Sequence, residues 1–464
     1  MRNFPSHAFR EYDIRGIADI DITEEFAYRL GKAFASMLPA DDKRPLSVGR
    51  DVRLSGLRLQ QAAMQGILST GRNIIDIGIT PTPLAYFSVF TLDTAGSLQI
   101  TASHNPSEYN GFKMMIGRNS LHGDDIQQLM MNMHKTTPDA SIQGTVESHN
   151  IADEYIDFVT GDCKLARPLK VVIDAGNGPS GIIAASLYRD LGCEVIELYC
   201  EPDGNFPNHH PDPTIAENIH DLAETVVAEH ADLGIAFDGD GDRIGVVDEY
   251  GHIIWGDMLL LLLSRHLLLQ HPGATIISEV KASQQMYDGI RQAGGNPVMW
   301  RTGHSPIKAK MKETGALLAG EMSGHMFFAD RFFGFDDGAY AGARVMQVLS
   351  DAHAPLSSLL NDIEPSHTTP EIRVPCPDTR KFALVEMAKE HFSALGYDII
   401  DIDGMRITFP DGFALLRASN TQPGLVMRFE AGSEDRLQEI RALLEDWLEQ
   451  QKRIQEVSEP INKP

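Results

Sequence analysis

The sequence predicts an α/β protein of three similar domains with mixed or largely parallel sheets, followed by a C-terminal α+β domain. Strand-like and helix-like patterns alternate along most of the 464 residues, and a βαβα order is typical of parallel sheets covered by helices. The same unit recurs three times, although the copies share no clear sequence identity. After Pro365 the pattern changes to three strands separated by short turns, with helices on either side.

The expected elements follow from local patterns in the chain. Apolar runs bounded by turn residues predict strands at 46–49, 74–77, 97–101, 169–173, 194–198, 233–237, 244–247, 275–278, 297–300, 405–409, 413–417 and 425–430. Helices are expected at 55–70, 83–92, 180–191, 215–229 and in a segment that ends at 293. The apolar run 258–263 is too short to cross a bilayer and predicts a buried helix. The polar tail 456–464 is expected to be loosely ordered.

These recurrences predict four domains. Length alone suggests about three domains, and four are compatible with it. The ends of the recurring units place the domains at 1–148, 149–252, 253–366 and 367–464.

Composition restricts the class of partner. The hydrophobic content of 42% and the charged content of 23% are those of an ordinary globular protein. A net charge of −25 argues against nucleic acid or an anionic membrane as a partner, but a locally positive pocket can still bind a small anion. The four cysteines include no C-x-x-C pair, which disfavours a zinc site. Without an apolar signal segment, a cytoplasmic location is expected.

The most informative motif is the acidic loop 238–243, DGDGDR, between two expected strands. Alternating glycines allow Asp238, Asp240 and Asp242 to converge on one point. Such an oxygen-only set favours Mg²⁺ or Ca²⁺ over zinc, and the neighbouring Arg243 suggests phosphate chemistry. An EF-hand is disfavoured because Arg243 occupies the position that requires glycine and because strands flank the loop. A solvated acidic turn without a metal is the simpler alternative.

A second loop, 101–106, reads TASHNP and follows a strand. Pro106 restricts Asn105 to an extended conformation and stiffens the loop, so that Ser103 is a candidate nucleophile. His104 is adjacent, but neighbouring side chains often point apart, and the pair is not by itself a catalytic dyad. An Asx-type turn with a buried histidine is the structural alternative.

Two further loops carry ligand-binding residue types. The loop 320–325, GEMSGH, offers hydrogen-bonding groups suited to sugar hydroxyls, and its glycine spacing differs from that of the hydrolase nucleophile elbow. The loop 417–423, RASNTQP, combines an arginine, hydroxyls and an amide into a possible phosphate site, which Arg428 of the next strand could join. A polar turn with an exposed arginine is the alternative.

The segment 176–181, GNGPSG, matches the dinucleotide-binding fingerprint, with Glu197 about twenty residues later. Its strand is internal to the chain and Pro179 stiffens the turn. We therefore interpret it as a structural strand-to-helix turn.

Together these motifs resemble the α-D-phosphohexomutase family, and most closely its bacterial phosphomannomutase/phosphoglucomutase branch. The resemblance extends from residue 12 to residue 428, and none of the motifs departs from the family pattern. It implies four domains around a central cleft, each of which contributes one loop. The markers, in family order, are 12–16 (YDIRG), 101–106, 238–243, 302–304 (TGH), 320–325 and the loop that begins at 417.

The resemblance implies a role for each candidate residue. Ser103 would carry a phosphoryl group, and Ser103, Asp238, Asp240 and Asp242 would ligate Mg²⁺. Positive charge around the phosphoserine would come from Arg15, Lys113 and Arg243, and the candidates for proton transfer are His104, Lys113 and His325. Sugar hydroxyls would be held by Glu321 and Ser323. The remaining substrate and phosphate contacts would come from Tyr12, Lys281, Thr302, Gly303, His304, His325, Arg417, Ser419, Asn420, Thr421 and Arg428.

The implied reaction interconverts hexose 1-phosphate and hexose 6-phosphate through a 1,6-bisphosphate, with glucose 1,6-bisphosphate or mannose 1,6-bisphosphate as activator. The loop reads Glu-Met-Ser rather than the Glu-Gln-Ser of phosphoglucosamine mutases, which favours mannose and glucose phosphates. A phosphoglucosamine mutase, an NAD-dependent oxidoreductase and a calcium-binding module are the alternatives. A monomer is favoured, and the preferred sugar is left open.

Overall fold

The computed structural model describes residues 4–135, 138–419 and 423–458, with side chains to residue 451. Contacts divide the chain into two compact units. The first comprises Met1–Ser278, Gly289–Val298 and Gly303–Asn361, and the second comprises Glu279–Asp288, Met299–Thr302 and Asp362–Pro464. Two short segments that lie in the third predicted domain along the chain therefore belong to the same unit as the C-terminal domain.

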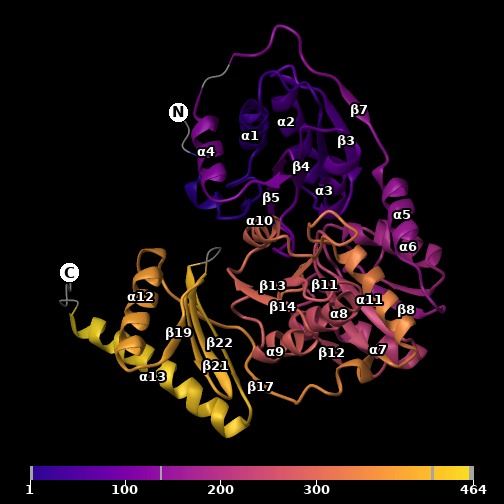
Figure 1. The fold of residues 1–464 in the computed structure, drawn as a ribbon. Helices are drawn as coiled ribbons and strands as arrows, with labels where there is room; N and C mark the ends of the chain where they lie inside the picture. The colour runs from indigo at the N-terminus through magenta and orange to yellow at the C-terminus, as the bar shows by residue number, and fades with distance from the viewer. Residues whose placement is uncertain (1–3, 136–137, 420–422, 459–464) are drawn as a thin grey trace. The chain divides into compact units, whose positions relative to one another are not determined.

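The first sheet is mixed, as predicted (Figure 1). Its central strand β2 is parallel to β3 and β4, whereas β5 runs antiparallel to both β4 and β1. Thr23 caps α1 by accepting a hydrogen bond from Phe26 N. The strands are β1 (Ile14–Ile17), β2 (Leu46–Arg50), β3 (Ile74–Ile79), β4 (Gly96–Ile100), β5 (Tyr109–Ile116), β6 (Asn119–Ser120) and β7 (Val146–Ser148). The helices are η1 (Ser6–Ala8), α1 (Glu24–Met37), α2 (Gly56–Leu68), α3 (Thr82–Thr91) and α4 (Asp124–Met133).

The second sheet has the order β12-β11-β10-β8-β9, with parallel pairing of β8 to β9 and β10 and an antiparallel pair β10–β11. The two helices predicted here each begin with a separate 3₁₀ turn. The strands are β8 (Lys170–Asp174), β9 (Glu194–Leu198), β10 (Leu233–Phe237), β11 (Ile244–Asp248) and β12 (Ile253–Ile254). The helices are α5 (Ile151–Asp162), η2 (Pro179–Ile182), α6 (Ala184–Asp190), η3 (Ala216–Ile219) and α7 (His220–Glu229).

The third sheet has the order β14-β13-β15-β16. The apolar run predicted as a buried helix lies in α8, whose leucines are almost all buried. The strands are β13 (Thr275–Glu279), β14 (Asn296–Trp300), β15 (Leu318–Gly320) and β16 (Met326–Phe328). The helices are α8 (Gly256–Gln270), α9 (Gln284–Gln292), α10 (His304–Thr314), α11 (Gly338–Ala352) and η4 (Leu356–Leu360).

The C-terminal sheet is antiparallel in every described pair, as predicted. Phe392 of α12 and Trp447 of α13 share one core with strand residues such as Leu416 and Phe429. The strands are β17 (His367–Thr368), β18 (Ile372–Pro375), β19 (Asp398–Ile400), β20 (Met405–Phe409), β21 (Gly412–Ala418) and β22 (Gly424–Ala431). The helices are α12 (Asp378–Ala394) and α13 (Glu434–Ser458).

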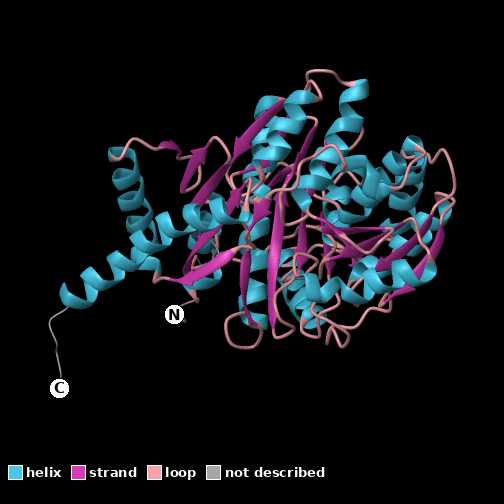
Figure 2. Cartoon of the chain, turned by 90° about the horizontal axis from the view of Figure 1, so that it is seen from below, coloured by secondary structure: helices cyan, strands magenta, loops and turns pink. Residues whose placement is uncertain are grey.

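The expectation of a loose tail from residue 456 is wrong for its first residues, because α13 continues to Ser458. Figure 2 shows this helix as the last element of the described chain. None of the helices in the described part of the chain combines the length and apolar character that a membrane span requires. The domain boundaries remain predictions.

Candidate active site

Ser103 lies in the loop that follows β4, with a backbone φ of 51°. This left-handed conformation is uncommon for a residue other than glycine and is often found at functional sites. Its N–H donates to Thr101 Oγ1 at 2.9 Å. The buried hydroxyl donates to Asp238 Oδ2 at 2.8 Å and lies 3.0 Å from His104 Nδ1. The side chains of Ser103 and His104 thus lie within hydrogen-bonding distance, although adjacency alone did not predict it.

The three aspartates of the acidic loop converge as the sequence predicted. Asp238, Asp240 and Asp242 are fully buried, and one oxygen of each lies within 4.8 Å of the others. Gly241 has a φ of 78°, which permits the tight turn. The Oδ1 atoms of Asp240 and Asp242 have no hydrogen-bond partner among the described residues. Buried carboxylate oxygens without partners fit a hard cation.

Two helices begin against this loop and hold it in place. Thr82, the first residue of α3, donates its N–H to Asp240 O at 2.8 Å and its hydroxyl to Asp240 Oδ2 at 2.5 Å. Gly338, the first residue of α11, donates its N–H to Gly241 O at 3.1 Å. The positive ends of two helix dipoles therefore face the acidic loop.

Lys113 of β5 is a buried cation within the carboxylate cluster. Its ammonium lies 2.8 Å from Asp240 Oδ2 and also contacts Asp242 Oδ2. Burial favours the neutral amine, but the two carboxylates outweigh it and raise the pKa of Lys113 well above its usual range. Burial and the neighbouring carboxylates raise the pKa of Asp238. Burial alone would also raise the pKa of Asp240, but Lys113 and Thr82 lower it.

His325 lies between an arginine and a carboxylate. Arg243 Nε donates to His325 Nε2 at 2.9 Å, so this nitrogen accepts and the ring proton resides on Nδ1. His325 Nδ1 lies 3.0 Å from Asp336 Oδ2 and 3.6 Å from Asp242 Oδ1. Asp336 is fully buried, and its other oxygen accepts a hydrogen bond from Lys308 Nζ at 3.0 Å.

Of the other two candidate histidines, His304 is buried and His104 is half-buried, and both lie near cations. Burial, with Arg243 and Arg15 nearby, lowers the pKa of His104 well below its usual range. Burial and Lys308 lower the pKa of His304 in the same way. Both rings are therefore neutral near pH 7.

Residues of the first and third predicted domains meet at the N-terminal marker. Arg15 donates to Asn105 Oδ1 at 2.6 Å and pairs with Asp13 at 2.7 Å, so it contacts the Ser103 loop. The Tyr12 ring lies edge-on to His304, with centroids 6.0 Å apart. Tyr12 and Arg15 thus connect the Ser103 loop with the His304 loop.

The sugar-binding candidate Glu321 is buried and accepts a hydrogen bond from Gly303 N at 2.6 Å. Gly303 has a φ of 127°, and a Cβ there would lie 2.5 Å from the Tyr12 ring. Ser323 is half-buried in the same turn, two residues before His325. The first unit therefore contains the serine, the aspartates, His304, Glu321 and His325.

The remaining candidates lie in the second unit. Lys281 Nζ lies 3.2 Å from Glu371. Thr302 N and the Arg417 guanidinium both donate to Asp403 Oδ2, at 3.0 Å and 3.1 Å. Asp403 thus connects two of the predicted substrate-binding residues.

Arg428 donates to the backbone oxygen of Lys281, so it lies beside the same segment. Ser419 is buried, and its carbonyl accepts a hydrogen bond from Lys381 Nζ at 2.6 Å. Asn420 and Thr421 lie outside the described residues.

The glycine-rich segment 176–181 supports a structural role. Asp174 accepts the Gly176 N–H at 2.8 Å and pairs with His209 at 2.9 Å. A carboxylate thus occupies the turn in which a dinucleotide would place its pyrophosphate. A Cβ on Gly178 would lie 3.4 Å from Gly239 O, so this turn packs behind the acidic loop.

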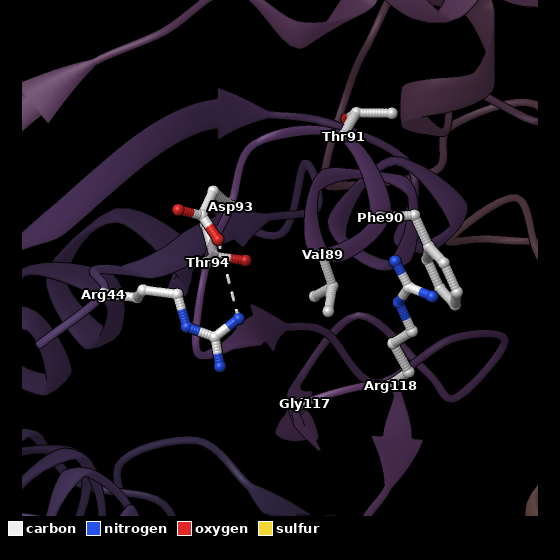
Figure 3. A pocket seen from close by; sticks show the side chains of 8 residues that line it. All are labelled: Arg44, Val89, Phe90, Thr91, Asp93, Thr94, Gly117 and Arg118. Carbon is white, nitrogen blue, oxygen red and sulfur yellow. Dashed lines mark ion pairs between the residues drawn. The ribbon is translucent and has the colours of Figure 1, made fainter. Parts of the chain in front are cut away.

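A separate hollow of about 290 Å³ lies at the C-terminal end of α3 (Figure 3). Arg44 on one wall lies 3.7 Å from Asp93, and the Arg118 guanidinium lies 4.9 Å from the Phe90 ring centroid. None of the predicted site residues that the structure describes lines it. The lining residues are Arg44, Val89, Phe90, Thr91, Asp93, Thr94, Gly117 and Arg118.

Sequence reasoning missed Asp336, Arg53, Glu371 and Asp403. Asp336 precedes the helix-capping residue Asp337 in an unremarkable Asp-Asp-Gly sequence. The local sequence predicts that an acidic residue caps the helix. This accounts for Asp337 but gives no reason to single out Asp336. The other three contact residues far away in the sequence: Arg53 donates to Ser103 O, Glu371 accepts from Lys281, and Asp403 accepts from Thr302 N.

A buried serine beside a carboxylate cluster, within α/β domains that precede an α+β domain, defines an enzyme of the phosphoryl-transfer kind. Models of the phosphoglucomutase/phosphomannomutase alpha/beta/alpha domains I, II and III match residues 6–139, 153–251 and 255–366. The model of the C-terminal domain matches residues 371–446. The chain belongs to the phosphoglucomutase/phosphomannomutase family.

Individual relatives agree over nearly the whole chain. A phosphomannomutase/phosphoglucomutase of Pseudomonas aeruginosa is 45% identical over 96% of each chain. A phosphoglucomutase of Neisseria meningitidis is 44% identical over 95% of this chain and 96% of its own. The crystal structure of a phosphoglucomutase/phosphomannomutase family protein from Burkholderia thailandensis, 41% identical, superposes with a TM-score of 0.89 over 97% of this chain and 98% of that one. The predicted family, fold class and hexose phosphate mutase function are confirmed, and the chain is an enzyme of the isomerase kind.

Proposed function

We propose that the enzyme interconverts the 1-phosphates and 6-phosphates of mannose and glucose through phosphorylated Ser103 and a 1,6-bisphosphate. The observation that carries the proposal is the position of the Ser103 hydroxyl, 2.8 Å from Asp238 within a buried carboxylate cluster. The names of the Pseudomonas and Neisseria relatives support glucose and mannose as the sugars.

Each half-reaction transfers one phosphoryl group. The sugar hydroxyl loses its proton to a base and forms a bond to phosphorus, while the bond between phosphorus and Ser103 Oγ breaks and Ser103 Oγ takes up a proton. After the bisphosphate has turned around, Ser103 Oγ loses that proton and bonds to the other phosphorus, and the released sugar oxygen takes up a proton. Of the three proton-transfer candidates, His325 is best supported, because the hydrogen bond from Arg243 defines its tautomer and Asp336 lies 3.0 Å from its Nδ1.

Asp238, Asp240 and Asp242, together with phosphorylated Ser103, would hold Mg²⁺. The Oδ1 atoms of Asp240 and Asp242, which lack hydrogen-bond partners among the described residues, support this assignment. When bound, the ion would neutralise the charge on the transferring phosphoryl group. Arg15, Lys113 and Arg243 supply fixed positive charge beside it.

The proposed substrate contacts fall into two sets. Glu321, Ser323 and His304 are proposed to hold sugar hydroxyls, with Tyr12 and Gly303 shaping that site. Lys281, Thr302 and the phosphate residues of the C-terminal loop are proposed to anchor the non-reacting phosphate, and this set is Arg417, Ser419, Asn420, Thr421 and Arg428. Thr302 and Arg417 both donate to Asp403, and Arg428 contacts the Lys281 segment, which supports a shared ligand for these residues.

A mutase assay tests the proposal directly. Mannose 1-phosphate and glucose 1-phosphate should both yield 6-phosphates when a catalytic amount of glucose 1,6-bisphosphate and Mg²⁺ are present. Intact-mass measurement after incubation with the bisphosphate should show one added phosphoryl group, which is absent in Ser103→Ala. Labelling that survives this substitution would contradict the assignment of Ser103. Glucosamine 1-phosphate as a preferred substrate would instead favour a phosphoglucosamine mutase.

We further propose a cytoplasmic location. The net charge of −25 argues against nucleic acid or an anionic membrane as a partner. We also propose a monomer. Light scattering after size-exclusion chromatography measures the mass in solution, to be compared with the chain mass of 51.2 kDa.

A further inference from the structure

Arg53 is a buried arginine directly beneath the Ser103 loop. It lies between β2 and α2, and its side chain is fully excluded from solvent. A guanidinium carries five N–H donors in one plane, and each of them has an acceptor here. Nε donates to Asp51 Oδ2 at 3.1 Å, and the other four N–H groups donate to Ser103 O at 2.7 Å, Asn105 O at 2.6 Å, Pro106 O at 2.6 Å and Tyr109 O at 2.9 Å.

Four of these acceptors are backbone oxygens of the segment 103–109, which runs from the Ser103 loop to the first residue of β5. Ser103 adopts the left-handed conformation, which the surrounding contacts must stabilise. Arg53 fixes the carbonyl of Ser103 itself and three carbonyls that follow it. The Ser103 carbonyl also lies against the acidic loop. A Cβ on Gly239 would lie 2.4 Å from Ser103 O.

Arg53 is itself fixed by Asp51. Asp51 Oδ1 accepts Arg53 N at 3.0 Å, Oδ2 accepts Arg53 Nε, and the Asp51 N–H donates to Ile100 O in β4 at 2.9 Å. The Phe206 ring covers the guanidinium, with its centroid 5.5 Å away. A buried ion pair is weak evidence for stability, because replacing it with apolar residues of similar volume often leaves a protein equally stable or more stable. Stability alone therefore does not account for this arrangement.

We infer that Arg53 is a positioning residue for phosphoryl transfer: it holds the Ser103 loop so that the serine hydroxyl faces Asp238. This inference rests on the proposed role of Ser103. The guanidinium has no donor left for a phosphate or a sugar, so it acts only through the loop. Lysine offers three donors from one nitrogen and cannot reproduce the planar pattern.

The test compares Arg53→Lys with the parent enzyme. Because a nucleophile misplaced by about 1 Å can lose about 100-fold in rate, kcat should fall about 100-fold. The KM for glucose 1-phosphate should stay within about threefold, since Arg53 touches no part of the proposed substrate site. Intact-mass kinetics with glucose 1,6-bisphosphate should show phosphorylation of Ser103 slowed by about the same factor as kcat.

The matched control is Ile67→Ala in α2, which opens a cavity in the core of the same domain without touching the loop. If Arg53→Lys does not fold, the double variant Asp51→Asn, Arg53→Gln is used in its place. It removes both buried charges together and so leaves no unpaired charge. It leaves two donors for the loop and should show the same loss of kcat.

Three results would overturn the inference. The first is a folded Arg53 variant whose kcat stays within about threefold of the parent, far from the loss expected for a displaced nucleophile. The second is a loss of kcat no greater than that of Ile67→Ala at a matched Tm. The third is a parent enzyme that the bisphosphate does not label at Ser103, which would overturn the proposed function as well.

Discussion

His325 Nδ1 lies 3.0 Å from Asp336 Oδ2, while His325 Nε2 accepts a hydrogen bond from Arg243. The two contacts fix both the orientation of the ring and the position of its proton. Asp336 lies in a buried place, where Lys308 outweighs burial and lowers the pKa of Asp336 well below the usual range. To accept a proton from a substrate hydroxyl, His325 Nε2 would have to release the hydrogen bond from Arg243.

Replacement of His325 by glutamine should lower kcat by about 10²–10⁴-fold, the usual contribution of general acid–base catalysis. Asp336→Asn should reproduce part of this loss and change the pH dependence of kcat, because the ring loses the carboxylate that orients it. Steady-state kinetics from pH 5 to pH 9 measure both effects. His104→Gln is the matched comparison. If kcat falls more in His104→Gln than in His325→Gln, His104 rather than His325 is the general base.

The metal assignment predicts a specific response to Asp240→Asn. Removal of one carboxylate lowers the negative charge that holds Mg²⁺, so activity should fall and recover in part at high Mg²⁺ concentration. Titration of activity against Mg²⁺ for the parent and the variant measures the shift. Full activity of the parent enzyme in excess chelator would refute the metal assignment.

Glu371 predicts a pH dependence of stability. Lys281 is the main cause that lowers the pKa of Glu371 from 4.5 to about 2, with Arg373 adding to it. A lowered carboxyl pKa stabilises the folded state above the unfolded pKa, and this contribution is lost as the pH falls from about 4.5 towards 2. At pH 7 Glu371→Gln should therefore cost about 1–3 kcal/mol, since one pKa unit corresponds to about 1.36 kcal/mol.

Urea unfolding at several pH values measures this difference. The gap between the parent and Glu371→Gln should close as the pH approaches 2. A gap of constant size across the range would show that the carboxylate charge is not its source.

Substrate range provides a further prediction. The 3- and 4-hydroxyls of the sugar approximately exchange places when the bisphosphate turns around, whereas the 2-hydroxyl has no such counterpart. Glu321 and Ser323 are expected to hold the former and to tolerate either configuration at C2. Mannose and glucose 1-phosphates should differ by no more than about a hundredfold in kcat/KM. A preference of about 10⁴-fold would mean that a hydrogen bond reads the 2-hydroxyl directly.

The parts of the site that the sequence predicted are local motifs. The loops that carry Ser103, Asp238 and Glu321 combine glycine or proline with functional side chains within a few residues, and such turn chemistry depends on neighbouring positions alone. The longer strands were also predicted locally, because each is an apolar run of neighbouring residues and each lies in a sheet of the structure.

The parts that the sequence did not predict depend on distant contacts. Arg53 acquires its role from carbonyls about fifty residues later, and Asp336 from a histidine in a separate turn. No local pattern distinguishes these residues from ordinary surface charges. The second unit gives a similar lesson, because Glu279–Asp288 belongs with the C-terminal domain through contacts such as those of Arg406 with Val280 O and Ala282 O.

The position of Lys113 affects how the acidic loop folds. An ammonium already set between Asp240 and Asp242 serves as an internal counter-ion for the acidic loop. The loop can then close before any cation arrives, unlike a zinc finger, whose folding free energy comes from its metal. Newly made chains would therefore reach their native fold regardless of the supply of divalent ions.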